Sequence, residues 1–240
     1  MWEEMTAYFS TQAQKAKGFE AVQPAVIAKH TTPAVQPRDG MYSNGAKRVF
    51  DITLILLALP VVIPIILLLA LLVRSDGGPS FYSHLRVGKN GHLYTMWKLR
   101  SMILGADSKL EAHLDSDPAA RAEWDSTQKL KSDPRITRIG RILRKSSLDE
   151  LPQLWNVLIG DMSLVGPRPM MPDQQAIYPG KSYCALRPGI TGNWQVSQRN
   201  QSTFADRAIF DDQYSRDLSF AMDTKLLLAT VRVVLHATGH

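Results

Sequence analysis

The residues best suited to chemistry are two adjacent acids, Asp149 and Glu150, in the segment Ser-Ser-Leu-Asp-Glu-Leu-Pro at 146–152. Ser147 and Glu150 have the spacing of a helix capping box, and apolar residues follow at helical intervals. We therefore expect both acids in the first turn of a helix, where free backbone N–H groups and the helix dipole favour ionised carboxylates. Taken alone, acids in such a position are most often ordinary residues of a helix start.

Cationic side chains come shortly before this acidic pair. Arg138, Arg141 and Arg144 recur along one stripe of a predicted helix, opposite apolar residues. A carboxylate beside an anion site can attack phosphorus if its charge is compensated, and adjacent acids on a helix point about 100° apart, so one can attack while the other binds a metal. The pattern predicts phosphoryl chemistry, with a solvated face or nucleic-acid binding as alternatives, although no recognised nucleic-acid module accompanies the stripe.

A further arginine, Arg168, stands between two prolines in Gly-Pro-Arg-Pro at 166–169. The prolines restrict the backbone, so the guanidinium is displayed rigidly, as suits a phosphate or a uracil. The plainer alternative is a surface turn with an incidental arginine. Glycine and proline at 187–192 predict a shaped loop downstream of it, and Arg199 follows this loop.

The elements that position these side chains begin with an apolar run at 52–73. It contains no charged side chain and predicts a membrane segment. Pro60 and Pro64 lie in its middle, where each removes a backbone donor and should kink or break a helix. Basic residues flank both ends, so the positive-inside preference draws both ends to the cytoplasmic side. A helix that bends near Pro64 and leaves by the face it entered satisfies both constraints, while one straight span remains the alternative.

Beyond this run, two β-prone segments, Phe81–Val87 and His92–Lys98, flank an Asn-Gly turn and predict a β-hairpin. Lys98 and Arg100 would project from the end of the second strand. The charged stretch 106–131 predicts two amphipathic surface helices that Pro118 separates.

Near the C-terminus, helical patterns appear at 204–214 and in the apolar run 226–235. The run is too short and too interrupted to cross a bilayer, so we expect it to pack in the domain or to lie along the membrane interface. The single cysteine, Cys184, excludes an intrachain disulfide and lacks the neighbours of a nucleophile.

The 240 residues and the net charge of +6 allow one ordinary domain with a membrane segment and anionic partners. We expect a disordered extension at 1–45, rich in proline and small residues, a re-entrant membrane helix at 46–75 and a catalytic domain at 76–240. The expected fold is α+β, mainly helical, with a short β-hairpin and interfacial amphipathic helices.

Five motifs occur along the chain in a fixed order. They are Lys47-Arg48-x-x-Asp51, Lys98-Leu99-Arg100-Ser101-Met102, Ser147 to Leu158, Gly160 to Pro169, and Arg187-Pro188-Gly189-Ile190-Thr191-Gly192. Together they resemble the motifs of the bacterial sugar transferases, which are monotopic polyprenol-phosphate phosphoglycosyltransferases. The resemblance covers most of the chain, from Lys47 to Val234.

The resemblance implies a two-step reaction at the cytoplasmic face of a bacterial inner membrane. Asp149 would attack the β-phosphorus of a UDP-sugar and release UMP, and undecaprenyl phosphate would then take the phosphosugar from the enzyme. Mg²⁺ would be the cofactor, bound by Glu150 with Asp149. The resemblance places the membrane break at Pro64 and gives the substrate contacts to Lys98, Arg100, Arg144, Arg168 and Arg199.

In this family the reaction primes exopolysaccharide or related glycan assembly. The insert near 107–131 is similar to that of members that transfer galactose phosphate or glucose phosphate, which favours UDP-galactose or UDP-glucose as donor. The expected partners are the UDP-sugar, undecaprenyl phosphate and membrane lipids, without nucleic acid. A homo-oligomer or a complex with glycan-assembly enzymes stays open, as does a non-catalytic role as a membrane-tethered scaffold.

Overall fold

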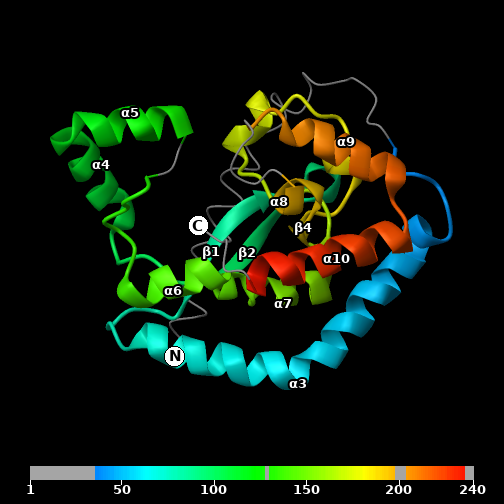
Figure 1. The fold of residues 1–240 in the computed structure, drawn as a ribbon, viewed down its shortest axis with the longest axis horizontal. Helices are drawn as coiled ribbons and strands as arrows, with labels where there is room; N and C mark the ends of the chain where they lie inside the picture. The colour runs from blue at the N-terminus through cyan, green and yellow to red at the C-terminus, as the bar shows by residue number, and fades with distance from the viewer. Residues whose placement is uncertain (1–35, 128–129, 198–203, 236–240) are drawn as a thin grey trace.

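The structure, a computed structural model, describes residues 36–127, 130–197 and 204–235. Its described part is mainly helical, as predicted, and carries two small sheets (Figure 1). The helices are α3 (Lys47–Arg74), α4 (Ala106–Ser116), α5 (Pro118–Thr127), α6 (Arg138–Ser146), α7 (Gln153–Ile159), α8 (Asn193–Ser197), α9 (Arg207–Asp217) and α10 (Phe220–Leu235). The strands are β1 (Phe81–Val87), β2 (Leu93–Leu99), β3 (Ser163–Val165) and β4 (Gly189–Thr191).

The predicted hairpin is confirmed: β1 and β2 pair antiparallel, in a register that sets Arg86 opposite Tyr94. The turn places Asn90 at φ 58° and Gly91 at φ 78°, the left-handed conformation that these residue types accept most readily. Lys98 lies near the end of β2, at the rim of the sheet. The hairpin therefore delivers a cation to one edge of the domain.

The second sheet, β3 with β4, was not predicted. These two short strands are parallel, with Ser163 opposite Gly189 and Val165 opposite Thr191. A Cβ atom on Gly189 would lie 2.1 Å from the backbone nitrogen of Gly166, so only glycine allows the two chains to approach this closely. The pairing places the Pro-Arg-Pro segment next to the loop that begins at Arg187.

The main core lies between the hairpin, α7, α10 and the first half of α3. Met96 and Tyr94 come from β2, Val157 from α7, and Leu226 from α10, and all are buried. α4 and α5 stand apart from this core (Figure 1) and bury a small cluster of their own around Leu114. The predicted pair of surface helices separated at Pro118 is thus confirmed.

Helix α3 is the one described helix long and apolar enough to cross a membrane. The helix continues from Lys47 to Arg74 with Pro60 and Pro64 inside it, so of the two predicted effects of proline, a kink or a break, the secondary structure shows no break. The helix bends along its length (Figure 1), as predicted for a helix in which proline removes a backbone donor. Whether it re-enters or spans the bilayer stays a prediction.

Both ends of α3 dock on the same domain. At its start Lys47 pairs with Asp223 of α10, and the Ser163 hydroxyl donates to Asp51 at 2.6 Å. At its end the Ser80 hydroxyl donates to the Ala70 carbonyl at 2.6 Å, while Val73 is buried against Leu99. Large apolar side chains between these ends are exposed, among them Leu57, Val61, Leu67, Leu68 and Leu71.

Part of the segment predicted to be disordered, 1–45, is ordered. Tyr42–Ala46 forms a short helical turn that leads into α3, and the Tyr42 hydroxyl donates to Asp223 at 2.7 Å. Residues 1–35 lie outside the described part of the chain, and so does the prediction for them.

Candidate active site

The acidic pair lies in a single 3-10 turn, Leu148–Glu150, between α6 and α7. The predicted capping box is wrong, because the Ser147 side chain makes no capping bond. Ser147 instead adopts φ 57° and ends α6, and its carbonyl accepts from the Glu150 N–H. α7 begins only at Gln153, so the acids precede that helix rather than forming its first turn.

Lys98 approaches both acids from β2. Its ammonium lies 2.7 Å from a Glu150 carboxylate oxygen and 3.9 Å from an Asp149 oxygen. Asp149 is only 7 % exposed. The three side chains therefore form one compact charge cluster, built by a strand end and a turn that are distant in sequence.

Burial raises the pKa of the Asp149 carboxyl above its ordinary value, and the negative charge of Glu150 adds to that rise. The charges of Lys98 and Arg144 act in the opposite direction. The expected preference for the ionised form at a helix start is thus outweighed by desolvation. Asp149 depends on its cationic neighbours for ionisation.

Arg144 reaches the same cluster from α6. Its guanidinium donates to the Ser101 hydroxyl at 2.9 Å, and it is close enough to Asp149 for the carboxylate to raise the arginine pKa against the lowering by burial. Arg138 and Arg141 of the same helix are exposed. The predicted cationic stripe therefore brings one of its members to the acids.

The described residues hold no cluster of three or more acidic, histidine or cysteine side chains that could bind a metal by themselves. Mg²⁺ commonly binds one or two carboxylates and completes its shell with water and substrate phosphates. Asp149 and Glu150 provide two oxygen donors that already hold a cation, the Lys98 ammonium. The donor set fits Mg²⁺ when phosphate oxygens are added.

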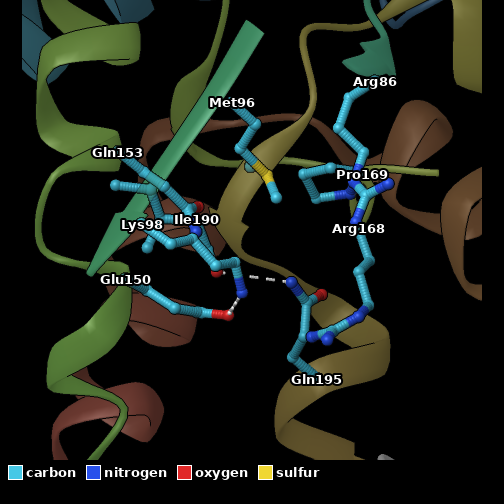
Figure 2. A pocket seen from close by; sticks show the side chains of 10 residues that line it. Arg86, Met96, Lys98, Glu150, Gln153, Arg168, Pro169, Ile190 and Gln195 are labelled. Atoms are coloured by element: carbon cyan, nitrogen blue, oxygen red, sulfur yellow. Dashed lines mark hydrogen bonds and ion pairs between the residues drawn. The ribbon is translucent and has the colours of Figure 1, made fainter. Parts of the chain in front are cut away.

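Two cavities adjoin the acidic pair. The polar cavity, of about 40 Å³, is shown in Figure 2. The apolar cavity, of about 200 Å³, lies between the 3-10 turn, α7, β4 and the end of α10. Glu150, Arg168, Ile190 and Gln195 line both, while Asp149 lines neither. The two cavities thus meet along one shared wall beside Glu150.

In the polar cavity Lys98 and Glu150 face Gln195 and Arg168 across the opening (Figure 2). The Arg168 guanidinium lies 5.7 Å from the ring centre of Trp194, and that of Arg207 lies 4.4 Å from the same ring. The tryptophan therefore helps to hold Arg168 at the cavity. Of the predicted substrate contacts, Lys98 and Arg168 line this cavity.

Sequence reasoning missed Arg86 and Gln195. Arg86 lies on β1, its Nε has no hydrogen-bond partner, and its pKa is lowered by burial and by the charge of Arg168. Gln195 leaves its buried Oε1 without a partner. A basic residue inside the β-prone run 81–87 was the available signal for Arg86, whereas nothing in the sequence marked Gln195.

Arg100, predicted to contact substrate, has protein partners in this structure, and its contact with substrate stays a prediction. Its guanidinium pairs with Asp76 and donates to the carbonyls of Val73, Pro79 and Met102. It lines neither cavity, because these contacts commit it to fastening the end of α3. Arg199 lies outside the described residues.

Comparison with known proteins gives one family: a model described as bacterial sugar transferase matches residues 42–237. The undecaprenyl-phosphate galactose phosphotransferase of Salmonella typhimurium is 46 % identical over 199 residues, which are 82 % of this chain and 42 % of that protein. The UDP-galactose-lipid carrier transferase of Erwinia amylovora has the same identity and coverage. The exopolysaccharide production protein ExoY of Sinorhizobium fredii is 42 % identical over 218 residues, 90 % of this chain and 95 % of that protein. This chain thus spans less than half of the first two relatives and nearly all of the third.

Proposed function

The chain belongs to the bacterial sugar transferase family, and we propose that it transfers a hexose-1-phosphate from UDP-galactose or UDP-glucose to undecaprenyl phosphate. The names of relatives support both substrates: one is a UDP-galactose-lipid carrier transferase, and others are undecaprenyl-phosphate galactose and glucose phosphotransferases. The name of ExoY supports a place in exopolysaccharide production, and we propose that the reaction is its priming step.

The observation that carries the proposal is the Asp149–Glu150 pair, held by Lys98 beside a cavity that Arg168 also lines. In the first step an Asp149 carboxylate oxygen bonds to the β-phosphorus of the donor. The bond from that phosphorus to the bridging oxygen breaks, and UMP leaves with the bridging oxygen. In the second step a phosphate oxygen of the acceptor attacks the same phosphorus, and the Asp149 carboxylate leaves unchanged.

The surrounding residues meet the electrostatic needs of both steps. Lys98 and Arg144 lower the pKa of Asp149 and so increase the ionised fraction that can attack. Arg168 offers a planar pair of donors to phosphate oxygens. Mg²⁺, bound by Glu150 with Asp149, would supply positive charge against the donor phosphates when present.

Access to Asp149 requires a change in the charge cluster. Asp149 is 7 % exposed and lines neither cavity, whereas Glu150 lines both. Donor phosphates entering the polar cavity would attract Lys98 away from the acids and uncover the Asp149 carboxylate. Glu150, the more accessible acid, is the competing nucleophile that an experiment must exclude.

We further propose that α3 is re-entrant and that the domain lies on the cytoplasmic face of the inner membrane. Support comes from the docking of both ends of α3 on one domain, with exposed apolar side chains between them. A domain on one side of a bilayer cannot hold both ends of a helix that crosses it.

The test is a single-turnover reaction of the full-length protein with UDP-galactose or UDP-glucose, without acceptor. We expect UMP release in an amount equal to enzyme, with an intact-mass gain of one hexose phosphate that peptide mapping places on Asp149. Asp149→Asn should abolish the adduct, whereas Glu150→Gln should slow it without moving it. An adduct on Glu150, or none with any UDP-sugar, would overturn the proposal.

A further inference from the structure

The apolar cavity has a chemistry distinct from that of its neighbour. Aliphatic side chains dominate its wall: Leu148, Leu151, Leu154, Val196, Val233 and Val234. Thr191 and Thr230 also line it, and their hydroxyl oxygens lie 2.7 Å apart, in a hydrogen bond with each other. The Thr230 hydroxyl also donates to the Leu226 carbonyl. Its interior therefore favours a hydrocarbon over a polar ligand.

Helix α10 forms part of the wall of this cavity. Val234 lines the cavity and is itself 39 % exposed. Leu228 and Val231 of the same helix are also exposed, at 63 % and 55 %. The cavity is thus continuous with an apolar helix face of the kind that lies against lipid.

The wall of the apolar cavity also includes residues of the candidate active site. Glu150 and Arg168 line it, and both also line the polar cavity. A ligand that fills this cavity therefore has an anionic head at Arg168 and a hydrocarbon tail against the aliphatic wall. A free nucleotide or sugar matches the polar cavity only.

We propose that the apolar cavity holds the isoprenoid units nearest the phosphate of the polyprenyl phosphate acceptor, a proposal that rests on the proposed function. At about 200 Å³ the cavity is smaller than the 300–1,000 Å³ of typical ligand pockets. It therefore takes only the first units, and the rest of the chain lies in lipid. Donor and acceptor occupy adjoining cavities and meet at the wall they share.

The first test separates the two half-reactions in detergent-solubilised full-length protein. Val233→Phe fills the apolar cavity, and Leu228→Phe is the matched control on the same helix, exposed and outside the cavity wall. We expect Val233→Phe to raise the KM for undecaprenyl phosphate about tenfold or more, as for the loss of roughly 1.4 kcal/mol of binding, and to leave donor-dependent UMP release within twofold. Leu228→Phe should change neither. An unchanged acceptor KM in Val233→Phe overturns the proposal, as does an equal loss in both half-reactions.

A second test does not depend on turnover or on a tolerated substitution. A polyprenyl phosphate with a photoreactive diazirine in its first isoprene unit is activated on the wild-type protein, and the labelled peptides are mapped. We expect labels within 146–154, 190–196 or 230–234, the segments that line the cavity, and competition by unlabelled undecaprenyl phosphate. Labels elsewhere, or competition by excess phosphatidylglycerol alone, which would make the occupant a bilayer lipid, overturn the assignment. If wild type shows this labelling yet never releases UMP, the proposed function fails while the lipid site stands.

Discussion

The Lys98 ammonium and the Glu150 carboxylate form an ion pair of 2.7 Å that joins the end of β2 to the turn between α6 and α7. The same ammonium is 3.9 Å from Asp149, so one cation serves two acids. A divalent cation bound by Glu150 would compete with Lys98. The position of this lysine therefore links metal binding, donor binding and the ionisation of Asp149.

The first prediction concerns the pH dependence of UMP release. Lys98 lowers the pKa of Asp149, while Glu150 raises it. Because the ionised carboxylate attacks, Lys98→Met should move the acid limb of the kcat/KM profile to higher pH. Glu150→Gln should move it to lower pH. The pH profiles of UMP release, measured in single turnover, check the two shifts. If the acid limbs of Lys98→Met and Glu150→Gln moved in the same direction, the assignment of Asp149 as the titrating nucleophile would be contradicted.

The second prediction compares Arg86 of β1 with Arg100, the residue that follows β2. Arg100 pairs with Asp76 and donates to three carbonyls. Arg86 has no acidic partner in the described structure, its Nε has no hydrogen-bond partner, and its Nη1 contacts only the His84 ring and the Leu85 carbonyl. Removing an arginine that is paired leaves its buried partners without a hydrogen-bond donor and lowers the free energy of unfolding. Removing a buried charge that no acid compensates takes away a desolvation cost and does not lower it. We expect Arg100→Met to lower Tm by several degrees and Arg86→Met to leave it equal or higher.

Binding of an anion tests whether Arg86 contacts phosphate in the polar cavity. Inorganic pyrophosphate should raise the Tm of the wild type, and of Arg100→Met by a similar increment, because neither loses a cation of the polar cavity. The increment should shrink in Arg86→Met. An Arg86→Met variant that is destabilised and yet keeps the full pyrophosphate increment would show that Arg86 is structural.

The sequence predicted the elements better than their junctions. The hairpin, the pair α4 and α5, and α6 follow from local patterns, namely an Asn-Gly turn, Pro118 and a regular arginine spacing. The capping box failed because Ser147 was needed to end the preceding helix. Local spacing cannot show which of two adjacent helices uses a residue at their boundary.

Residues of the candidate site could be predicted where they belong to a sequence motif. Residues that only tertiary packing brings to the site could not. Lys98 and Arg168 both line the polar cavity, yet Arg100, two residues from Lys98, is committed to α3. The place of Gln195 in the polar cavity could not be predicted, because it depends on the pairing of β3 with β4, which joins segments that are distant in sequence. The apolar cavity likewise depends on α10 meeting the turn after α6.

The third prediction concerns topology. Asn44 and Ser75 are exposed residues just outside the two ends of α3. With Cys184→Ser as background, since Cys184 is the single cysteine, Asn44→Cys and Ser75→Cys should both be labelled by an impermeant maleimide in inverted inner-membrane vesicles. Neither should react in intact spheroplasts. Labelling of the two positions from opposite sides would reject re-entry.

The fourth prediction concerns stability and rests on Asp211 of α9. Burial raises the pKa of this carboxyl to about 7, and the Tyr178 hydroxyl, which donates to it at 2.6 Å, partly opposes that rise. In the unfolded chain an aspartate titrates near 4. The folded state thus keeps a proton that the unfolded state releases, so stability from this group is full below about pH 4 and is lost as pH rises to about 7. We expect the wild-type Tm to fall by several degrees more than that of Asp211→Asn across this range, measured by thermal unfolding in one detergent.

A second variant tests the hydrogen bond to Asp211. Tyr178→Phe removes the donor that favours the carboxylate and should extend the fall in Tm above pH 7. Equal slopes in wild type and Asp211→Asn would show that the buried acid does not titrate in this range.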